Sequence, residues 1–132
     1  MLRLLHRDFH ITVVAPEISV CRDKEVRGIV GRYSIPLATL KDLPRDLSGV
    51  ALGICDRDFF SAGRARELKA RGAKVVWSNE MMWAFKGEAE VGAEGLVDKV
   101  LFVSEFQANA SAEIYKGVPH FNTGNYIDPE GL

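Results

Sequence analysis

Three apolar runs in the second part of the chain constrain its fold more than any other feature. They span residues 49–55, 73–78 and 97–103. A segment with helical character follows each run, over residues 62–71, 84–96 and 105–115. Continuous apolar strands that alternate with helices are typical of a parallel sheet covered on both faces, with right-handed crossovers.

The first part of the chain adds weaker elements. A β-branched run at 10–16 predicts a strand, preceded by the last turns of a helix over 1–9. Residues 25–33 fit either a short strand or a turn-rich loop, because two glycines interrupt the apolar positions. Residues 35–47 combine two prolines with leucines three to four residues apart, which predicts a short, broken helix.

A fifth short strand is predicted over residues 120–125. With 132 residues the chain has the length of one domain with one core. We therefore predict an α/β fold that is Rossmann-like and doubly wound. A mostly parallel sheet of about five to six strands would form its centre, in a single domain over residues 1–132.

The charge balance and the cysteines exclude several classes of protein. Seventeen basic and 18 acidic residues give a net charge of −1, so no strong attraction to nucleic acid follows and no nucleic-acid partner is expected. The apolar runs are far shorter than the roughly 18 to 20 residues of a membrane helix, and no transmembrane segment is predicted. Cys21 and Cys55 form no disulfide framework, which favours free thiols and the cytoplasm, and the apolar run that ends at Cys55 predicts that its thiol is buried.

Polar residues follow three of the predicted strands, at the edge where open parallel sheets bind ligands. They are Asp56 and Arg57, then Asn79 and Glu80, then Ser104 and Glu105. A carboxylate at that edge could act as a general base toward a substrate hydroxyl, with an amide to orient it. These residue types are also the usual ones in turns and helix N-caps, so both interpretations stay open.

An unusual stretch of two methionines and a tryptophan follows Glu80. Met81, Met82 and Trp83 could form an adaptable wall against a ligand such as a sugar ring. Filling of the core beneath the next helix is an equally good interpretation.

Other motifs are absent. Residues 28–32 lack the ending of a phosphate loop, no Gly-x-Ser-x-Gly occurs, and the three histidines have no metal-ligand spacing. No metal site is therefore predicted, and the basic segment 64–71 is interpreted as a solvated helix face.

The end of the chain resembles the end of the N-terminal domain of retaining glycosyltransferases of the GT-B fold, family 4 type. The motifs that carry the resemblance are Asp-Lys-Val-Leu-Phe-Val-Ser-Glu-Phe-Gln at 98–107, Gly-Val-Pro at 117–119 and Thr-Gly-Asn-Tyr-Ile-Asp at 123–128. Residues 73–80 are similar to the preceding strand of that family, although Asn79-Glu80 stands where many members carry a histidine. The resemblance covers roughly residues 50 to 130.

The resemblance implies the acceptor-binding half of an enzyme that moves a sugar from a nucleotide-sugar donor to a hydroxyl. Glu80 would contact the reacting hydroxyl as the catalytic residue, and no metal or other cofactor is implied. The substrate-binding residues would be Asn79, Trp83, Asp56, Arg57, Ser104 and Glu105. Residues 124–132 would begin the interdomain hinge.

In the family the donor binds mainly to a C-terminal domain, which does not follow Leu132 in this sequence. The expected partners are therefore such a domain, in cis or in trans, and a sugar or glycan acceptor. The chain alone is not expected to catalyse transfer.

The alternative is a non-catalytic flavodoxin-like or receiver-like α/β domain that binds a ligand or a protein. A phosphorylatable receiver would need a lysine at the end of its last strand, where this chain has Asn125. A scaffold that pairs with another chain stays open.

Overall fold

The computed structural model describes residues 7–57, 59–80 and 83–124. Within these ranges the protein is an α/β structure with six strands in two parallel sheets and five α-helices. It divides into two compact units, one within residues 7–44 and one within residues 45–124, and each is described by itself. No helix in the described ranges is long and apolar enough to cross a membrane.

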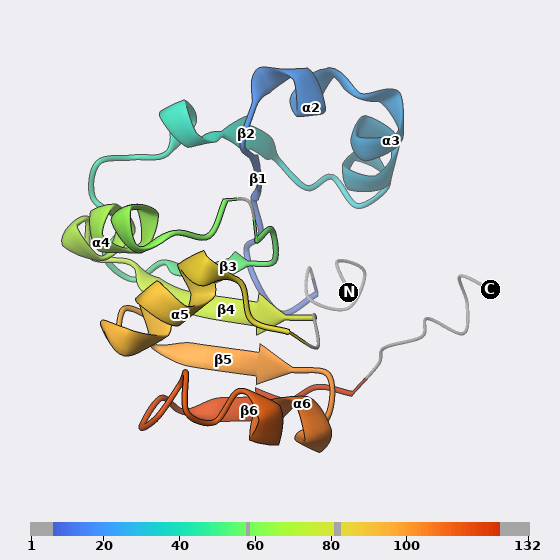
Figure 1. Cartoon of the computed structure of the whole chain (residues 1–132). Coiled ribbons are helices and arrows are strands. Elements are labelled where there is room, and N and C mark those ends of the chain that lie inside the picture. The colour runs from blue at the N-terminus through green and yellow to red at the C-terminus, as the bar shows by residue number, and fades with distance from the viewer. Residues whose placement is uncertain (1–6, 58, 81–82, 125–132) are drawn as a thin grey trace. The chain divides into compact units, whose positions relative to one another are not determined.

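The first unit contains a two-stranded parallel sheet and two helices (Figure 1). Strands β1 (Val13–Ala15) and β2 (Leu37–Thr39) pair in the register Val13 to Leu37. Helices α2 (Ile18–Arg22) and α3 (Lys24–Arg32) lie between them in sequence, and a 3₁₀ turn (Leu40–Asp42) follows β2.

Two predictions for this unit are wrong. Residues 25–33 were expected to form a strand or loop, but they belong to helix α3, because Asp23 accepts hydrogen bonds from Glu25 N at 2.8 Å and Val26 N at 3.0 Å and caps it. The broken helix expected at 35–47 is instead strand β2 and the 3₁₀ turn. The predicted strand at 10–16 is confirmed as β1, and the helix expected over 1–9 falls mostly outside the described residues.

The second unit is a four-stranded parallel sheet in the order β3-β4-β5-β6. Its strands are β3 (Ala51–Ile54), β4 (Lys74–Asn79), β5 (Lys99–Phe102) and β6 (His120–Asn122). The helices between them are α4 (Ala62–Ala70), α5 (Lys86–Ala93) and α6 (Glu105–Ala110). The alternation predicted from residue 49 onward is confirmed, and every pairing is parallel.

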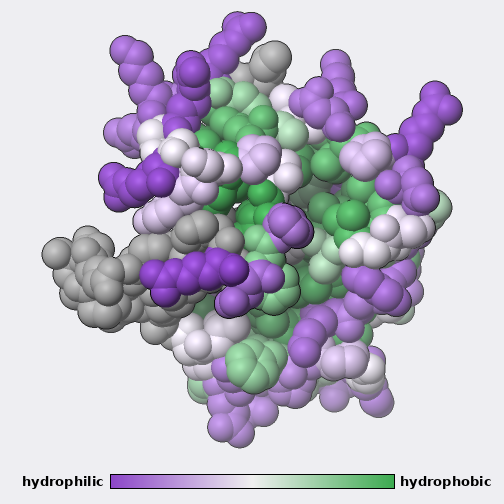
Figure 2. All heavy atoms as spheres, turned by 180° about the vertical axis from the view of Figure 1, so that it is seen from behind, coloured by the Kyte–Doolittle hydropathy of each residue, from purple (hydrophilic) through white to green (hydrophobic). Residues whose placement is uncertain are grey.

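The strand order places the three helices of this unit on one face of its sheet. Each crossover joins adjacent strands in the same direction, and right-handed crossovers then put all the helices on the same side. Residues on that side are buried, as Val75 and Trp77 show, whereas Val76 on the other side is half-buried and Phe121 is exposed. Figure 2, which views the molecule from behind, shows hydrophobic residues at the surface among hydrophilic ones.

The prediction of one sheet of five to six strands is therefore wrong in its size. The six strands are divided between sheets of two and four. Periodicity identifies a strand, but it does not determine which neighbour that strand pairs with.

Aromatic and aliphatic side chains fill the space between the second sheet and its helices. Phe60 stacks on Trp77 with ring centroids 4.2 Å apart, and Phe85 meets both rings edge-on. Leu68 from α4 and Val91 from α5 are also buried here. This rigid layer holds the carboxyl ends of β3 and β4 in place.

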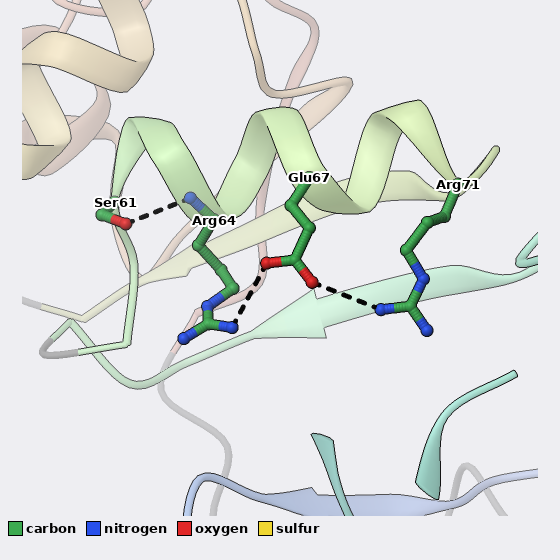
Figure 3. Close-up of polar contacts among 4 residues, drawn as sticks. All are labelled: Ser61, Arg64, Glu67 and Arg71. Atoms are coloured by element: carbon green, nitrogen blue, oxygen red, sulfur yellow. Dashed lines mark hydrogen bonds and ion pairs between the residues drawn. The ribbon is translucent and has the colours of Figure 1, made fainter. Parts of the chain in front are cut away.

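Helix α4 carries its charges in matched pairs (Figure 3). The Ser61 hydroxyl accepts a hydrogen bond from Arg64 N at 3.2 Å and caps the helix, and Glu67 lies between Arg64 and Arg71, at 3.4 and 3.5 Å. Arg66 reaches Glu94 with two hydrogen bonds, and Lys69 binds Asp98 at 2.9 Å. The basic segment is thus a solvated face whose cations have carboxylate partners.

Candidate functional site

The candidate site lies at the carboxyl edge of the four-stranded sheet. Because β3, β4 and β5 are parallel, the residues that follow them meet at this edge. Asp56 and Arg57 follow β3, Glu80 follows β4, and Glu105 follows β5; all four are exposed. The predicted convergence of polar residues at one edge agrees with this topology.

Besides burial, the negative charges of two of these carboxylates raise the pKa of the same thiol, that of Cys55. The pKa of Cys55 is raised, first by partial burial of the thiol and then by the negative charges of Glu80 and Asp56. Glu80 and Asp56 thus follow neighbouring strands, β4 and β3, and both charges reach Cys55 at the end of β3. Cys55 itself, expected to be buried, is an exposed residue, and both it and Cys21 are free thiols.

Two aromatic residues, Trp83 and Phe85, follow the end of β4. Trp83 is 61% exposed, so its indole is not part of the core. The Arg57 guanidinium lies over the Phe85 ring, 5.1 Å from its centroid, and this contact restrains the cation. Met81 and Met82, predicted to share a wall with Trp83, lie outside the described residues.

Asn79 occupies a different environment from the other candidates. It is 1% exposed, and its amide donates to Glu88 and accepts from Gln107 Nε2 at 3.1 Å. The Asn79 side chain thus braces the end of β4 from the helix side, rather than reaching outward.

Gln107 extends this brace to the end of β5. Its Oε1 accepts from Val103 N at 2.9 Å, and its own backbone N–H donates to the Ser104 hydroxyl at 3.2 Å. Ser104 is therefore the N-cap of α6, which is the structural role weighed against substrate binding. The strand ends before Glu80 and before Glu105 are fixed by one buried network.

Glu88 is at the centre of this network and is itself 1% exposed. Its Oε1 accepts hydrogen bonds from Trp77 Nε1 at 3.3 Å, from the Tyr115 hydroxyl at 3.0 Å and from Asn79 Nδ2. Burial raises the pKa of Glu88, although the hydrogen bonds from Tyr115 and Trp77 oppose this shift. Burial and the neighbouring Glu88 also raise the pKa of Tyr115 well above its usual range.

Sequence reasoning missed Glu88, Gln107 and Tyr115. A signal for Gln107 exists, since Ser104-x-x-Gln107 is the spacing of a capping box. Glu88 has the matching position in α5, three residues after the N-cap Phe85. The helical segment was predicted to begin at residue 84, so this spacing was not recognised. Tyr115 carries no local signal, because its partner lies 27 residues away.

A surface depression of about 370 Å³ lies at the opposite, amino-terminal edge of the same sheet. It is lined by Arg45, Asp46, Ser48, Ala70, Arg71 and Gly72. Asp46 accepts a hydrogen bond from Ser48 N there, and Arg71 contacts Glu67 and the Arg45 carbonyl, so its polar groups serve local structure. We place the candidate site at the carboxyl edge, where charged groups from separate strands converge.

The described residues contain no group of three side chains able to hold a metal ion. The chain matches no protein-family model, no curated protein and no solved structure. What the fold defines is therefore the broad class, an α/β protein with parallel sheets. The resemblance to GT-B glycosyltransferases remains an expectation drawn from residues 50–130, and residues 125–132 of the expected hinge lie outside the described ranges.

Proposed function

We propose that this chain is the acceptor-binding half of a glycosyltransferase, with a sugar hydroxyl as the group that enters its site. The nucleotide-sugar donor would bind mainly to a C-terminal domain supplied in cis or in trans. Glu80 would take the proton of the acceptor hydroxyl as its oxygen bonds to the donor sugar, while the bond from the sugar to the diphosphate breaks and the nucleoside diphosphate leaves on the C-terminal domain. The free thiols of Cys21 and Cys55 agree with the cytoplasm as the proposed compartment.

The observation that carries this proposal is the parallel pairing of β3 and β4, which brings the exposed Asp56 and Glu80 to the same edge of the sheet. Two carboxylates provide several hydrogen-bond acceptors for neighbouring hydroxyls. The exposed Trp83 adds a flat apolar surface of the kind that packs against a sugar ring. Acidic groups beside an exposed aromatic ring suit a neutral polyhydroxyl ligand better than an anionic one.

The other proposed residues either could contact a ligand directly or support the strand ends. Arg57 is held on Phe85 and could donate hydrogen bonds to a ligand hydroxyl from a fixed position. Glu105 is exposed in the first turn of α6. Ser104 and Asn79 support the edge from within, since their polar groups are engaged in the cap and in the buried network.

The test is sugar binding by the isolated chain, followed in ¹H–¹⁵N spectra with methyl α- and β-hexosides and common disaccharides as probes. We expect saturable shifts centred on Glu80 and Trp83, and their loss in Glu80→Gln and Trp83→Ala. Glu113→Gln, an exposed glutamate after α6, is the matched control and should bind as the unchanged chain does. Shifts spread over the surface, or equal binding by Glu80→Gln, would remove the basis of the proposal.

A nucleotide-sugar probe tests whether the donor binds to this chain or to another domain. We expect UDP-glucose to show little or no binding in calorimetry with this chain alone. Tight binding would contradict the placement of the donor site on another domain.

A second candidate is a non-catalytic interaction domain, favoured by exposed aromatic residues in the second unit. Phe106 is 67% exposed and Phe121 59% exposed. If these rings form a contact surface, sedimentation velocity should show concentration-dependent association that Phe106→Ser and Phe121→Ser abolish, with no response to sugars.

A further inference from the structure

The two oxygens of the buried Glu88 carboxyl have very different surroundings. Oε1 accepts three hydrogen bonds, from Trp77, Asn79 and Tyr115. Oε2 is buried and has no hydrogen-bond partner among the described residues. A buried carboxyl oxygen without a partner is costly when the group is ionised and much less so when it is neutral.

A single cation lies among the groups that act on this carboxyl. The Arg57 guanidinium rests 5.1 Å from the centroid of the Phe85 ring, and Phe85 is the N-cap of α5, three residues before Glu88. The Phe85 ring in turn packs edge-on against Trp77, at 6.2 Å, and Trp77 donates to Glu88. Contacts through the Phe85 and Trp77 rings thus connect Arg57, in the segment that follows β3, to the carboxyl.

The other groups that face Glu88 come from three elements. Trp77 and Asn79 belong to β4, the Tyr115 hydroxyl comes from the segment after α6, and the backbone N–H of Phe85 is on the same helix as Glu88. Of all these groups, Arg57 and Tyr115 are the ones that carry or change charge. The Tyr115 phenol stays neutral at ordinary pH because its pKa is raised, so Arg57 is the counter-ion available to an ionised Glu88.

We propose that Glu88 and Arg57 form a proton-controlled switch at the carboxyl edge of the sheet. The structure shows the guanidinium on Phe85, and in this proposal that position belongs to the protonated state of Glu88. When the carboxyl releases its proton to solvent, Oε2 carries charge with no side-chain donor, and the guanidinium leaves the ring to hydrogen-bond with it. A charge-assisted hydrogen bond between the guanidinium and the ionised Oε2 outweighs a cation–π contact at an exposed site.

The switch changes the charge presented at the candidate site. Arg57 directly follows Asp56, and Asp56 and Glu80 follow two neighbouring parallel strands. Withdrawal of the guanidinium toward Glu88 leaves that edge more acidic. This inference concerns the chain's own residues and does not depend on the proposed transferase role.

The experiment follows both groups in the whole chain by NMR, from about pH 4 to pH 9. The ¹³Cδ signal of Glu88 reports its ionisation, and the ¹⁵Nε–¹Hε signal of Arg57 reports its environment. We expect both signals to change with one shared midpoint, above the usual range for glutamate. In Glu88→Gln, the Arg57 signal should no longer change over this pH range. In Arg57→Gln, the midpoint of the Glu88 titration should move to higher pH, because the cation favours the ionised carboxyl.

The matched control is Arg64→Gln, since Arg64 lies over the Phe59 ring at 4.7 Å in a similar contact that does not involve Glu88. It should leave the Glu88 midpoint and the Arg57 signal unchanged. An Arg57 signal that ignores the titration of Glu88, or a midpoint unaffected by Arg57→Gln, overturns the switch. If Glu88→Gln fails to fold, the Arg57→Gln titration decides the question alone, because Glu88 is intact there.

Discussion

Replacement of Gly92 by alanine should destabilise the protein, against the expectation from helix propensity. Gly92 lies within α5, where alanine is intrinsically favoured over glycine by about 1 kcal/mol. A Cβ at this position would lie 2.3 Å from the carbonyl oxygen of Ile114, 2.7 Å from its Cγ2 and 3.0 Å from its carbonyl carbon. The closest neighbour is backbone, so it cannot rotate away.

The size of the effect follows from how far α5 must move. The shortest contact is roughly 1 Å inside the range of ordinary van der Waals contact, and overpacking of this kind costs about 1–3 kcal/mol or more. The clash and the propensity gain oppose each other, and we expect a net loss of about 2 kcal/mol, because the shift of α5 also disturbs the neighbouring Glu88 network.

Gly63→Ala is the matched control. Gly63 lies in the first turn of α4, and nothing lies within 4 Å of a Cβ built there. This variant should be as stable as the unchanged chain or more stable by a few tenths of a kcal/mol. The same substitution in two helices then separates propensity from packing.

Urea unfolding, followed by the fluorescence of the buried Trp77, measures the difference. With a slope of about 1–3 kcal/mol per molar urea, Gly92→Ala should lower the midpoint by roughly 1 M relative to Gly63→Ala. If Gly92→Ala is as stable as Gly63→Ala, the close approach of α5 to Ile114 is not a feature of the folded protein.

Three further predictions concern stability. Because folding raises the pKa of Glu88, its contribution to the free energy of unfolding is fully present below the usual glutamate pKa and is lost as pH rises through the pKa of the folded state. In urea titrations, Glu88→Gln should therefore lose less stability than the unchanged chain between pH 5 and pH 8. Burial opposes ionisation of Asp98, but hydrogen bonds from the Val75 N–H and the Lys69 ammonium outweigh it and lower the pKa of Asp98. Asp98→Asn should therefore cost about 1–2 kcal/mol of stability at neutral pH, and less as pH falls below the usual aspartate pKa. A stability difference that does not change with pH would contradict this. Ser104→Ala removes the cap of α6 and should cost about 1 kcal/mol in thermal unfolding, whereas Ser104→Asp should retain the cap.

The elements of the second unit were predictable because their signals are strong and local. The runs around Val75 and Val100 are apolar on both sides of the strand, and glycine or serine marks the helix boundaries, as at Ser104 and Gly72. Helix α3 was not predictable in this way, since Gly28 and Gly31 lower its propensity. A Cβ at either position would meet nothing within 4 Å, so these glycines fill no packing need.

The candidate site, too, could be predicted from the sequence only in part. The position of Asp56 and Glu80 at one edge of the sheet followed from parallel topology alone, because strand direction determines which strand ends share an edge. The inward direction of Asn79 did not follow, since it depends on Glu88 and Gln107, which are brought to it by two later crossovers. Long-range partners of this kind leave no periodic trace in the sequence.

The consecutive strand order of the second unit also shapes how it can form during synthesis. Each strand pairs with the one just made, and paired residues such as Ala51 with Lys74, or Val76 with Lys99, are only about twenty residues apart, so every closure carries a similar, modest entropy cost. No strand has to wait for a distant segment to emerge from the ribosome. The sheet can therefore grow strand by strand from β3 to β6, with each finished pair as the template for the next.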